Sequence, residues 1–257
     1  MQKQKVTSSH YAKIADHYNH AFFHGDSIDY QNWVLQKVLH HLQLKAPDQV
    51  VDIGCGTGTF TSALYDQIEF KQEIIGVDSS PEMLTHANTL RGIRTHCTDA
   101  VSFSQSHEYQ YDKALMMGII HHIDLADLPR LYKGIYQQLR KGGILLTITR
   151  PNIVHYPFFQ AALDIWSQFQ PDSELYIQLQ KEAGFSVNCQ TDDYPLQIPK
   201  TQWFEMIKNR FWSTFSHFTD EELQAGLVEL ENKYAKAEVL NFVDTLVFIE
   251  AQKPQCH

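Results

Sequence analysis

The sequence predicts an α/β protein in which helices cover both faces of one seven-stranded sheet. From residue 48 onward, short apolar runs alternate with amphipathic segments, and the turns that join them are short. Two further apolar runs, on either side of a long helical stretch, complete the seven strands. Alternation of this kind is typical of parallel strands joined by helical crossovers. The fixed hand of such crossovers makes the sheet doubly wound, in a Rossmann-like arrangement.

The first elements can be placed in order along the chain. Residues 1–46 have helical character, and one apolar stripe at helical spacing runs through residues 30–44. Pro47 and Asp48 end this stripe. Five strands are then expected at residues 50–53, 74–77, 93–97, 111–117 and 144–149, with helices at 81–90 and 125–139.

The tail departs from this alternation. A strand at 186–191 and a strand at 246–249 flank one long helical stretch at 201–236. We therefore expect a single domain over residues 1–257, with a helical insertion before the last strand. Its expected parts are an N-terminal helical cap (1–46), a cofactor-binding core (47–150), the rest of the core (151–193 and 239–257) and a helical lid (194–238).

The composition limits the kinds of molecule that the protein is expected to bind and the cellular compartment expected for it. The formal net charge is −9 and no cluster of Lys and Arg stands out, which disfavours binding to nucleic acid. Apolar runs are too short to span a bilayer, and the first residues contain no apolar segment typical of a signal peptide. The four cysteines are scattered without a CxxC pair. We expect a reduced, cytoplasmic protein.

A glycine-rich loop follows the first strand directly. Gly54, Gly56 and Gly58 alternate with other residues between that strand and the next helix. Glycine at such positions lets the backbone pass close to a ligand. A dinucleotide-binding loop needs Gly or Ala where Thr59 stands, so the spacing argues against a dehydrogenase. Asp52, just before the loop, suits a ligand with a positively charged end.

Together these residues resemble motif I of the class I S-adenosylmethionine-dependent methyltransferases. Residues 76–84 resemble the second motif of that family, in which an acidic residue, here Asp78, accepts hydrogen bonds from both ribose hydroxyls. Residues 98–100 resemble the adenine site, with Asp99 facing the exocyclic amine. Residues 115–123 resemble the exit of the fourth strand beside the methionine moiety, and residues 139–145 the turn before the fifth strand.

The resemblance implies S-adenosylmethionine as the cofactor and gives a set of binding residues. Tyr18 belongs to an N-terminal segment that resembles the helix laid across the cofactor in relatives, although packing in the core is an alternative for it. Cys55 occupies a variable position, and no chemical role is expected for its thiol. The full set is Asp52, Gly54, Cys55, Gly56, Gly58, Asp78, Ser79, Met83, Asp99, Ala100, Met117, Gly118 and Tyr18.

Transfer of a methyl group from a sulfonium needs alignment and exclusion of water, and a base only when the acceptor carries a proton. His121 and His122 follow the fourth strand and are the catalytic candidates. Alternatively, one caps the next helix and the other packs beneath the cofactor. His20 and His24 have i,i+4 spacing, but no third ligand is suggested, so no metal site is expected.

Specificity for the acceptor is expected outside the common core. The segment after the fifth strand and the insertion before the last strand are rich in aromatic residues. Aromatic walls suit an apolar, flat or cationic acceptor, whereas arginines suit a carboxylate. Alternatively, the insertion forms its own small core or a dimer contact. The candidate substrate-binding residues are Arg150, Tyr156, Trp203, Arg210 and Trp212.

The sequence thus predicts a small-molecule methyltransferase that transfers to O or N and is a monomer or homodimer. It resembles the group of trans-aconitate and juvenile-hormone-acid methyltransferases. One alternative is methylation of RNA or protein, which would need a basic or extended groove. Another is a non-catalytic, cofactor-binding subunit of a partner enzyme.

Overall fold

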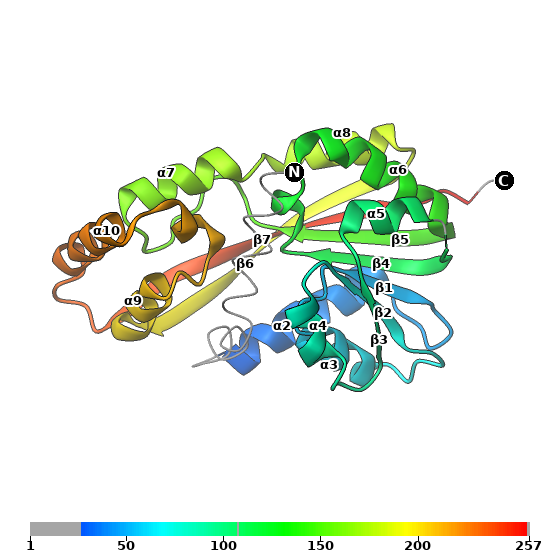
Figure 1. The fold of residues 1–257 in the computed structure, drawn as a ribbon, viewed down its shortest axis with the longest axis horizontal. Helices are drawn as coiled ribbons and strands as arrows, with labels where there is room; N and C mark the ends of the chain where they lie inside the picture. Colours follow the sequence, from blue (N-terminus) through cyan, green and yellow to red (C-terminus); the bar gives the residue numbers. More distant parts are fainter. Residues whose placement is uncertain (1–26, 107, 256–257) are drawn as a thin grey trace.

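One mixed sheet organises the chain in the computed structural model, which describes residues 27–106 and 108–255. Within these residues, seven strands pair in the order β3-β2-β1-β4-β5-β7-β6 (Figure 1). Five neighbouring strands are parallel: β1 (Val50–Ile53), β2 (Ile74–Asp78), β3 (Ile93–Cys97), β4 (Tyr111–Met117) and β5 (Leu139–Thr149). The strand order reverses between β1 and β4, as in a doubly wound sheet.

The last two strands change the direction of the sheet. β7 (Val239–Gln252) runs antiparallel between β5 and β6 (Ser186–Pro199). The predicted α/β class, the seven strands and the helical insertion before the last strand are confirmed. The antiparallel direction of β7 was not part of the prediction. Of the predicted N-terminal helical cap, the structure describes α2 (Ser27–Leu42).

Helices cover both faces because alternate residues of each strand point to opposite sides. On one face, α5 (Ala100–Ser106), α6 (Leu128–Gln138) and α8 (Ser173–Glu182) pack on the sheet. On the other face, α2 and α3 (Thr59–Gln67) pack on the alternate residues of the same strands. α4 (Pro81–Ala87) contacts β2 and β3. The core therefore has two layers, one on each side of the sheet.

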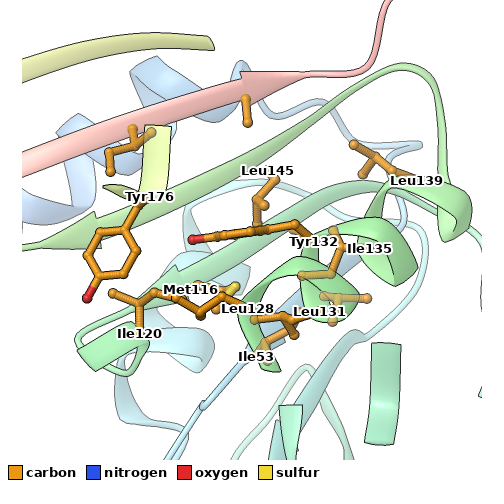
Figure 2. Packing of buried hydrophobic residues seen from close by; sticks show 14 of the residues in the cluster. Ile53, Met116, Ile120, Leu128, Leu131, Tyr132, Ile135, Leu139, Leu145 and Tyr176 are labelled. Carbon is orange, nitrogen blue, oxygen red and sulfur yellow. The ribbon is translucent and has the colours of Figure 1, made fainter. Parts of the chain in front are cut away.

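The layer beneath α6 shows how these faces are filled. Leu131, Tyr132 and Ile135 recur at helical spacing on α6, and none of them is exposed. In Figure 2 they lie against Met116 and Leu145 of the sheet. Full burial of a large apolar side chain is worth about 1.5–3 kcal/mol. This layer holds β1 and β4 in place, and with them the loops that leave their carboxyl ends.

Several predicted boundaries were wrong. β5 begins at Leu139 rather than residue 144, because the first residue of the expected turn already pairs with Tyr111. The strands predicted at 186–191 and 246–249 are both much longer, since they pair with each other as far as Pro199 and Val239. The single helix predicted at 201–236 is broken.

The break divides this helical stretch into three parts. They are α9 (Lys200–Lys208), a 3-10 turn at Ser213–His217 and α10 (Asp220–Lys233). Arg210 has a positive φ of 54°, a conformation that ends an α-helix. Thr219 then begins α10, with a capping box formed with Glu222.

The β6–β7 hairpin continues past the end of β5 and carries a helical group. β5 ends its pairing with β7 at Thr149 and Val247, whereas β6 and β7 stay paired beyond that point. At the far end, α7 (Gln160–Phe169), α9 and α10 lie together (Figure 1). We call residues 151–169 and 200–238 the cap. Its buried residues form a third hydrophobic cluster, which includes Phe158, Phe159, Trp203 and Phe215.

No helix in the described part of the chain is long and apolar enough to cross a membrane.

Candidate functional site

The glycine-rich loop bends tightly around the end of β2. The Gly54 and Cys55 amides both donate to the Val77 carbonyl oxygen, at 2.7 and 3.0 Å. Gly54 has a φ of 84°, and a Cβ on it would lie 2.4 Å from the Ile119 side chain. The loop therefore needs glycine at this position for both its backbone conformation and its packing against the exit of β4.

Two glycines at this edge of the sheet face open space. Gly56 (φ 55°), after β1, and Gly118 (φ 70°), after β4, would each place a Cβ with no atom of the described residues within 4 Å. Gly58 instead lies close to Ile93 and Ala87, so it serves packing. Because β1 and β4 are neighbours, both open glycines lie at one edge, at the switch in strand order. Ligands of doubly wound sheets bind at such an edge.

Asp78 holds the loop from the carboxyl end of β2. Its Oδ2 accepts a hydrogen bond from the Gly56 amide and its Oδ1 accepts one from the Ser80 amide, both at 2.9 Å. Burial raises the pKa of this carboxyl, although backbone amides of Ser80 and Gly56 oppose the rise. Each carboxylate oxygen retains a further lone pair for a ligand hydroxyl. Next to it, Ser79 is exposed, and Met83 is buried on α4.

Asp52 is a buried acid beneath the same loop. It is 4% exposed, and its Oδ2 accepts a hydrogen bond from the Thr61 hydroxyl at 2.5 Å. Burial raises its pKa to about 6, against the effect of Thr61 and with a contribution from Asp78. Burial and the charge of Asp52 also raise the pKa of the Cys55 thiol, which keeps it protonated at neutral pH. A cationic ligand here would favour the ionised form of Asp52.

Asp99 caps the helix that follows β3. Its Oδ1 accepts hydrogen bonds from the Val101 and Ser102 amides, both at 2.9 Å, and its Oδ2 accepts one from the Ser102 hydroxyl at 2.7 Å. Ala100, half-buried, is the first residue of α5. The sequence prediction assigned both residues to the adenine site and did not include this helix.

The two candidate histidines lie in a 3-10 turn, Ile120–His122, after Gly118. The ring centroids of His121 and His122 are 3.9 Å apart, and both side chains are half-buried. Met117, the last residue of β4, is also half-buried. The turn thus places both imidazoles directly after the open end of β4. Imidazole is suited to proton transfer near neutral pH.

Arg150 and Tyr156, two predicted substrate-binding residues, belong to one buried network around Asp244. Arg150 donates from Nε to Asp244 Oδ1 at 2.9 Å and from Nη2 to Oδ2 at 2.8 Å. The Tyr30 hydroxyl donates to Oδ2 at 2.5 Å, and the Tyr156 hydroxyl donates to Oδ1. The network therefore joins α2, the end of β5, the start of the cap and β7.

The charges in this network stabilise each other. Burial would raise the pKa of the Asp244 carboxyl, but Arg150 and the two tyrosine hydroxyls hold it below its ordinary value. Burial would lower the pKa of the Arg150 guanidinium, whereas Asp244 raises it well above the usual range. Burial and Asp244 raise the pKa of Tyr30 and Tyr156, so both hydroxyls remain protonated donors. Arg150 and Asp244 are therefore a permanent ion pair.

The other three predicted substrate-binding residues lie in the cap. Trp203 is buried, and its Nε1 donates to the Pro157 carbonyl oxygen at 2.8 Å. Trp212 packs at 4.7 Å from Trp203, between ring centroids. Arg210 donates to carbonyl oxygens within the cap and to Asp220. These contacts give the three residues structural roles in the cap, and their binding to an acceptor stays a prediction.

The structure therefore groups the predicted residues in two places. The predicted cofactor set lies at the carboxyl ends of β1, β2 and β4 and on the loops and helices that follow β1, β2, β3 and β4. The exception is Tyr18, which lies outside the described residues together with His20 and His24. The predicted acceptor set lies at the end of β5 and in the cap. Sequence reasoning missed Asp244, Tyr30 and Thr61. For Asp244 a signal existed, since it is an acid within the apolar alternation of residues 239–249.

Comparison with known proteins identifies the central segment. Residues 50–143 match the family model described as a methyltransferase domain. This segment includes β1 to β4 and the loops described above. The predicted resemblance to class I methyltransferases is therefore confirmed for this part of the chain.

The curated relatives are distant, and the matches cover less than half of their length. Trans-aconitate 2-methyltransferase of Deinococcus radiodurans is 34% identical over 109 residues, which are 42% of this chain and 40% of that protein. Phosphoethanolamine N-methyltransferase 3 of Arabidopsis thaliana is 27% identical over 196 residues, 72% of this chain and 39% of that protein. This chain therefore spans less than half the length of the curated relatives it matches.

Solved structures share the fold. One is a phosphoethanolamine N-methyltransferase of Haemonchus contortus in complex with S-adenosyl-L-methionine, with a TM-score of 0.59 and 19% identity. The match covers 95% of this chain and 57% of that chain. At this level of identity the likeness concerns the fold, and the geometry described above must carry the chemistry.

Proposed function

We propose that this chain, which carries a methyltransferase domain over residues 50–143, is an S-adenosylmethionine-dependent methyltransferase that acts on a small molecule. One observation carries the proposal. Gly56 and Gly118 leave open space at the carboxyl ends of β1 and β4, and Asp78 is held beside the first of them by the Gly56 amide. This is the edge at which a doubly wound sheet binds its cofactor.

The residues at this edge fit S-adenosylmethionine. The Asp78 carboxylate has free lone pairs for the two ribose hydroxyls. Asp52 offers a negative charge beneath the loop for the cationic part of the cofactor, and its raised pKa indicates that a positive charge would be favourable there. Gly56 and Gly118 let the cofactor approach the backbone closely. Asp99 and Ala100 lie at the start of α5, beside β3, where the adenine would be recognised.

The cofactor supplies a methyl group that its sulfonium already activates. The bond from sulfur to methyl breaks as the bond from methyl to the acceptor O or N forms, and S-adenosylhomocysteine is released. If the acceptor carries a proton, His121 or His122 takes it, because both imidazoles follow the open end of β4. The protein otherwise contributes alignment and exclusion of water.

The acceptor is proposed to lie between this edge and the cap. The cap helices α7, α9 and α10 lie beyond the end of the sheet at which β5 stops (Figure 1), and their cluster is rich in aromatic residues. The predicted lid, residues 194–238 of a single domain, stays part of this proposal, although its first residues, 194–199, belong to β6. Relatives are named for trans-aconitate and phosphoethanolamine, and these two compounds are the first acceptors to test.

The experiment has two steps. Calorimetry with S-adenosylmethionine, S-adenosylhomocysteine and NAD should give binding of the first two and not of the third. Incubation with methyl-labelled cofactor and a metabolite extract, followed by mass spectrometry, should give a labelled small molecule together with S-adenosylhomocysteine. Binding of NAD in place of S-adenosylmethionine would overturn the proposal. Binding without any methyl transfer would indicate a non-catalytic subunit instead.

A further inference from the structure

The network around Asp244 lies next to the proposed transfer site. Arg150 is the first residue after β5, and β5 is paired with β4. The Gly118 amide donates to the Ile148 carbonyl oxygen at 2.9 Å, so the open end of β4 lies beside the last residues of β5. Adjacent strands are about 4.8 Å apart. The backbone of Arg150 therefore begins at the same edge as Gly118.

The network uses only part of the Arg150 guanidinium. Nε and Nη2 bind the two Asp244 oxygens, and the same two nitrogens also donate to the hydroxyls of Tyr156 and Tyr30. Among the described residues, none accepts a hydrogen bond from Nη1. The Arg150 side chain is 22% exposed, whereas Asp244 is 5% exposed. One edge of the guanidinium is thus fixed and the other is available.

We propose, on the basis of the function proposed above, that the Nη1 edge of Arg150 binds an oxyanion of the acceptor, either a carboxylate or a phosphate. Asp244 is then the positioning residue that fixes the guanidinium plane. Guanidinium and carboxylate or phosphate groups match each other in plane and charge, which makes such contacts specific.

The hydrogen bonds of the network determine whether an anionic or a cationic group of the acceptor would bind beside Arg150. Asp244 already accepts four hydrogen bonds, so its oxygens are occupied. The tyrosine hydroxyls use their protons on Asp244. What the network leaves unused is the Nη1 donor edge of Arg150, which has no acceptor to offer an ammonium group. A cationic part of the acceptor would have to be bound elsewhere, against aromatic rings.

The test measures binding of anions without requiring turnover. The protein, saturated with S-adenosylhomocysteine, is titrated calorimetrically with succinate, trans-aconitate, inorganic phosphate and phosphoethanolamine, and with the uncharged ester dimethyl succinate. We expect at least one anion to bind and the ester not to bind. The carboxylates and the phosphates are titrated separately, so the compound that binds shows whether the oxyanion is a carboxylate or a phosphate.

Two variants assign that binding to Arg150. Arg150→Gln alone would leave Asp244 buried without a counter-ion, which is strongly destabilising. The variant Arg150→Gln/Asp244→Asn removes both charges together and keeps polar groups in both places. We expect it to remain folded, to bind S-adenosylhomocysteine within threefold of the unaltered protein, and to bind the anion at least tenfold more weakly. Arg150→Lys keeps the positive charge but not the planar guanidinium group, and should also weaken binding of the anion at least tenfold.

The matched control is Arg130→Gln, which removes an exposed arginine on α6 that pairs only with Asp127. It should leave the affinity for every anion unchanged. The proposal is overturned if no anion binds better than the ester, or if the Arg150 variants bind the anion as the unaltered protein does. Failure to bind S-adenosylhomocysteine would instead overturn the proposed function, and titration of the protein without it would still test Arg150.

Discussion

At the scale of single residues, the most unusual group is a carboxyl buried beneath the glycine-rich loop. Asp52 has a pKa of about 6 because of its burial, and it lies within the segment that binds cofactor in the proposed function. Its only hydrogen-bond donor among the described residues is the Thr61 hydroxyl. Ionisation of Asp52 is unfavourable in the free protein, and a cationic ligand would make it more favourable. The pKa of Asp52 therefore links the stability of the fold to the binding of such a ligand.

This link gives a prediction about pH. The pKa of Asp52 is above its unfolded value of 3.8, so the folded protein holds the proton more tightly. Its contribution to stability is fully present below about pH 4 and is lost as the pH rises through about 6. The loss is of the order of 3 kcal/mol. Asp52→Asn should therefore flatten the fall in unfolding free energy over this range.

The measurement is urea denaturation of the cofactor-free protein at several pH values from 4 to 7. Asp66→Asn, which removes an exposed acid on α3, is the control and should leave the profile of the unaltered protein in place. The same slope in Asp52→Asn as in the unaltered protein would show that Asp52 ionises normally.

Asp78 gives a second prediction at this scale. Asp78→Ala removes the acceptor for two ribose hydroxyls and also releases the Gly56 amide. Two hydrogen bonds to a charged acceptor are worth about 2–3 kcal/mol together, so the dissociation constant for S-adenosylmethionine should rise roughly 30- to 150-fold. Calorimetry with Asp66→Ala as the control tests this. An affinity equal to that of the control would remove Asp78 from the cofactor site.

At the scale of elements, the turn Ile120–His122 carries the proposed base. If the acceptor must lose a proton, His121→Asn or His122→Asn should lower turnover by the order of 100-fold and leave cofactor affinity nearly unchanged. Rates measured from pH 6 to 9 with the acceptor found by labelling test this, with exposed His40→Asn as the control. Near-normal rates in both variants across that range would mean that alignment alone drives transfer.

The break between α9 and α10 gives a prediction about stability. The Arg210 guanidinium binds the carbonyl oxygens of Phe215 and Phe218 and the side chain of Asp220, which closes the 3-10 turn between the helices. Arg210→Ala should lower the melting temperature by several degrees, at about 2–4 °C per kcal/mol lost. Lys208→Ala, which removes an exposed ion pair on α9, should change it little. An unchanged melting temperature in Arg210→Ala would show that Arg210 does not stabilise the turn between α9 and α10.

The elements also differ in how far local sequence could predict them. The strands at 50–53, 93–97 and 111–117 have the predicted bounds, because a glycine adjoins each of them: Gly54, Gly92 and Gly118. β6 and β7 were underestimated, since their outer halves owe their conformation to pairing with each other across the chain. Tyr194, Leu196 and Ile198 alternate with exposed residues, but only the partner strand shows that this alternation is a strand.

The candidate site divides in the same way. The glycine loop and Asp78 were predictable because each belongs to a short motif that the spacing of its residues reveals. Asp244 was not, because its role depends on Tyr30 and Arg150, more than 90 residues away in the chain. The sequence therefore predicted the loop and the acid beside it, and it assigned Arg150 to an acceptor without Asp244, its partner in the ion pair.

At the scale of the whole molecule, the hydrophobic core is divided into three clusters, two in the sheet and its helices and one in the cap. Two clusters hold the sheet and its helices, and the third lies in the cap and shares no residue with them. The long β6–β7 hairpin and the Asp244 network are the connections between the cap and the sheet. Fold alone does not determine the acceptor. In the proposed function, acceptor specificity varies in the cap while the residues proposed to bind the cofactor stay fixed.

This separation predicts that damage to the cap leaves cofactor binding intact. Trp203 is 2% exposed within the cap cluster, and Trp203→Ala should cost about 3–5 kcal/mol of local stability. The dissociation constant for S-adenosylhomocysteine should nevertheless change by less than about threefold, because no residue of that cluster belongs to the loops after β1, β2 or β4. Thermal denaturation and calorimetry on the same samples test both parts.

The contrasting variant is Leu131→Ala, which opens a cavity in the layer beneath β1 and β4 (Figure 2). It should lower the melting temperature and also weaken cofactor binding, because the loops of the site leave the strands that this layer supports.

Trp212→Ala, at a half-buried position of the cap, should raise the KM for the acceptor if the cap is a lid. A lower melting temperature with a normal KM would make Trp212 part of the packing alone. A tenfold loss of S-adenosylhomocysteine affinity in Trp203→Ala would show that the cap also takes part in cofactor binding, and the proposed division of tasks would then be wrong.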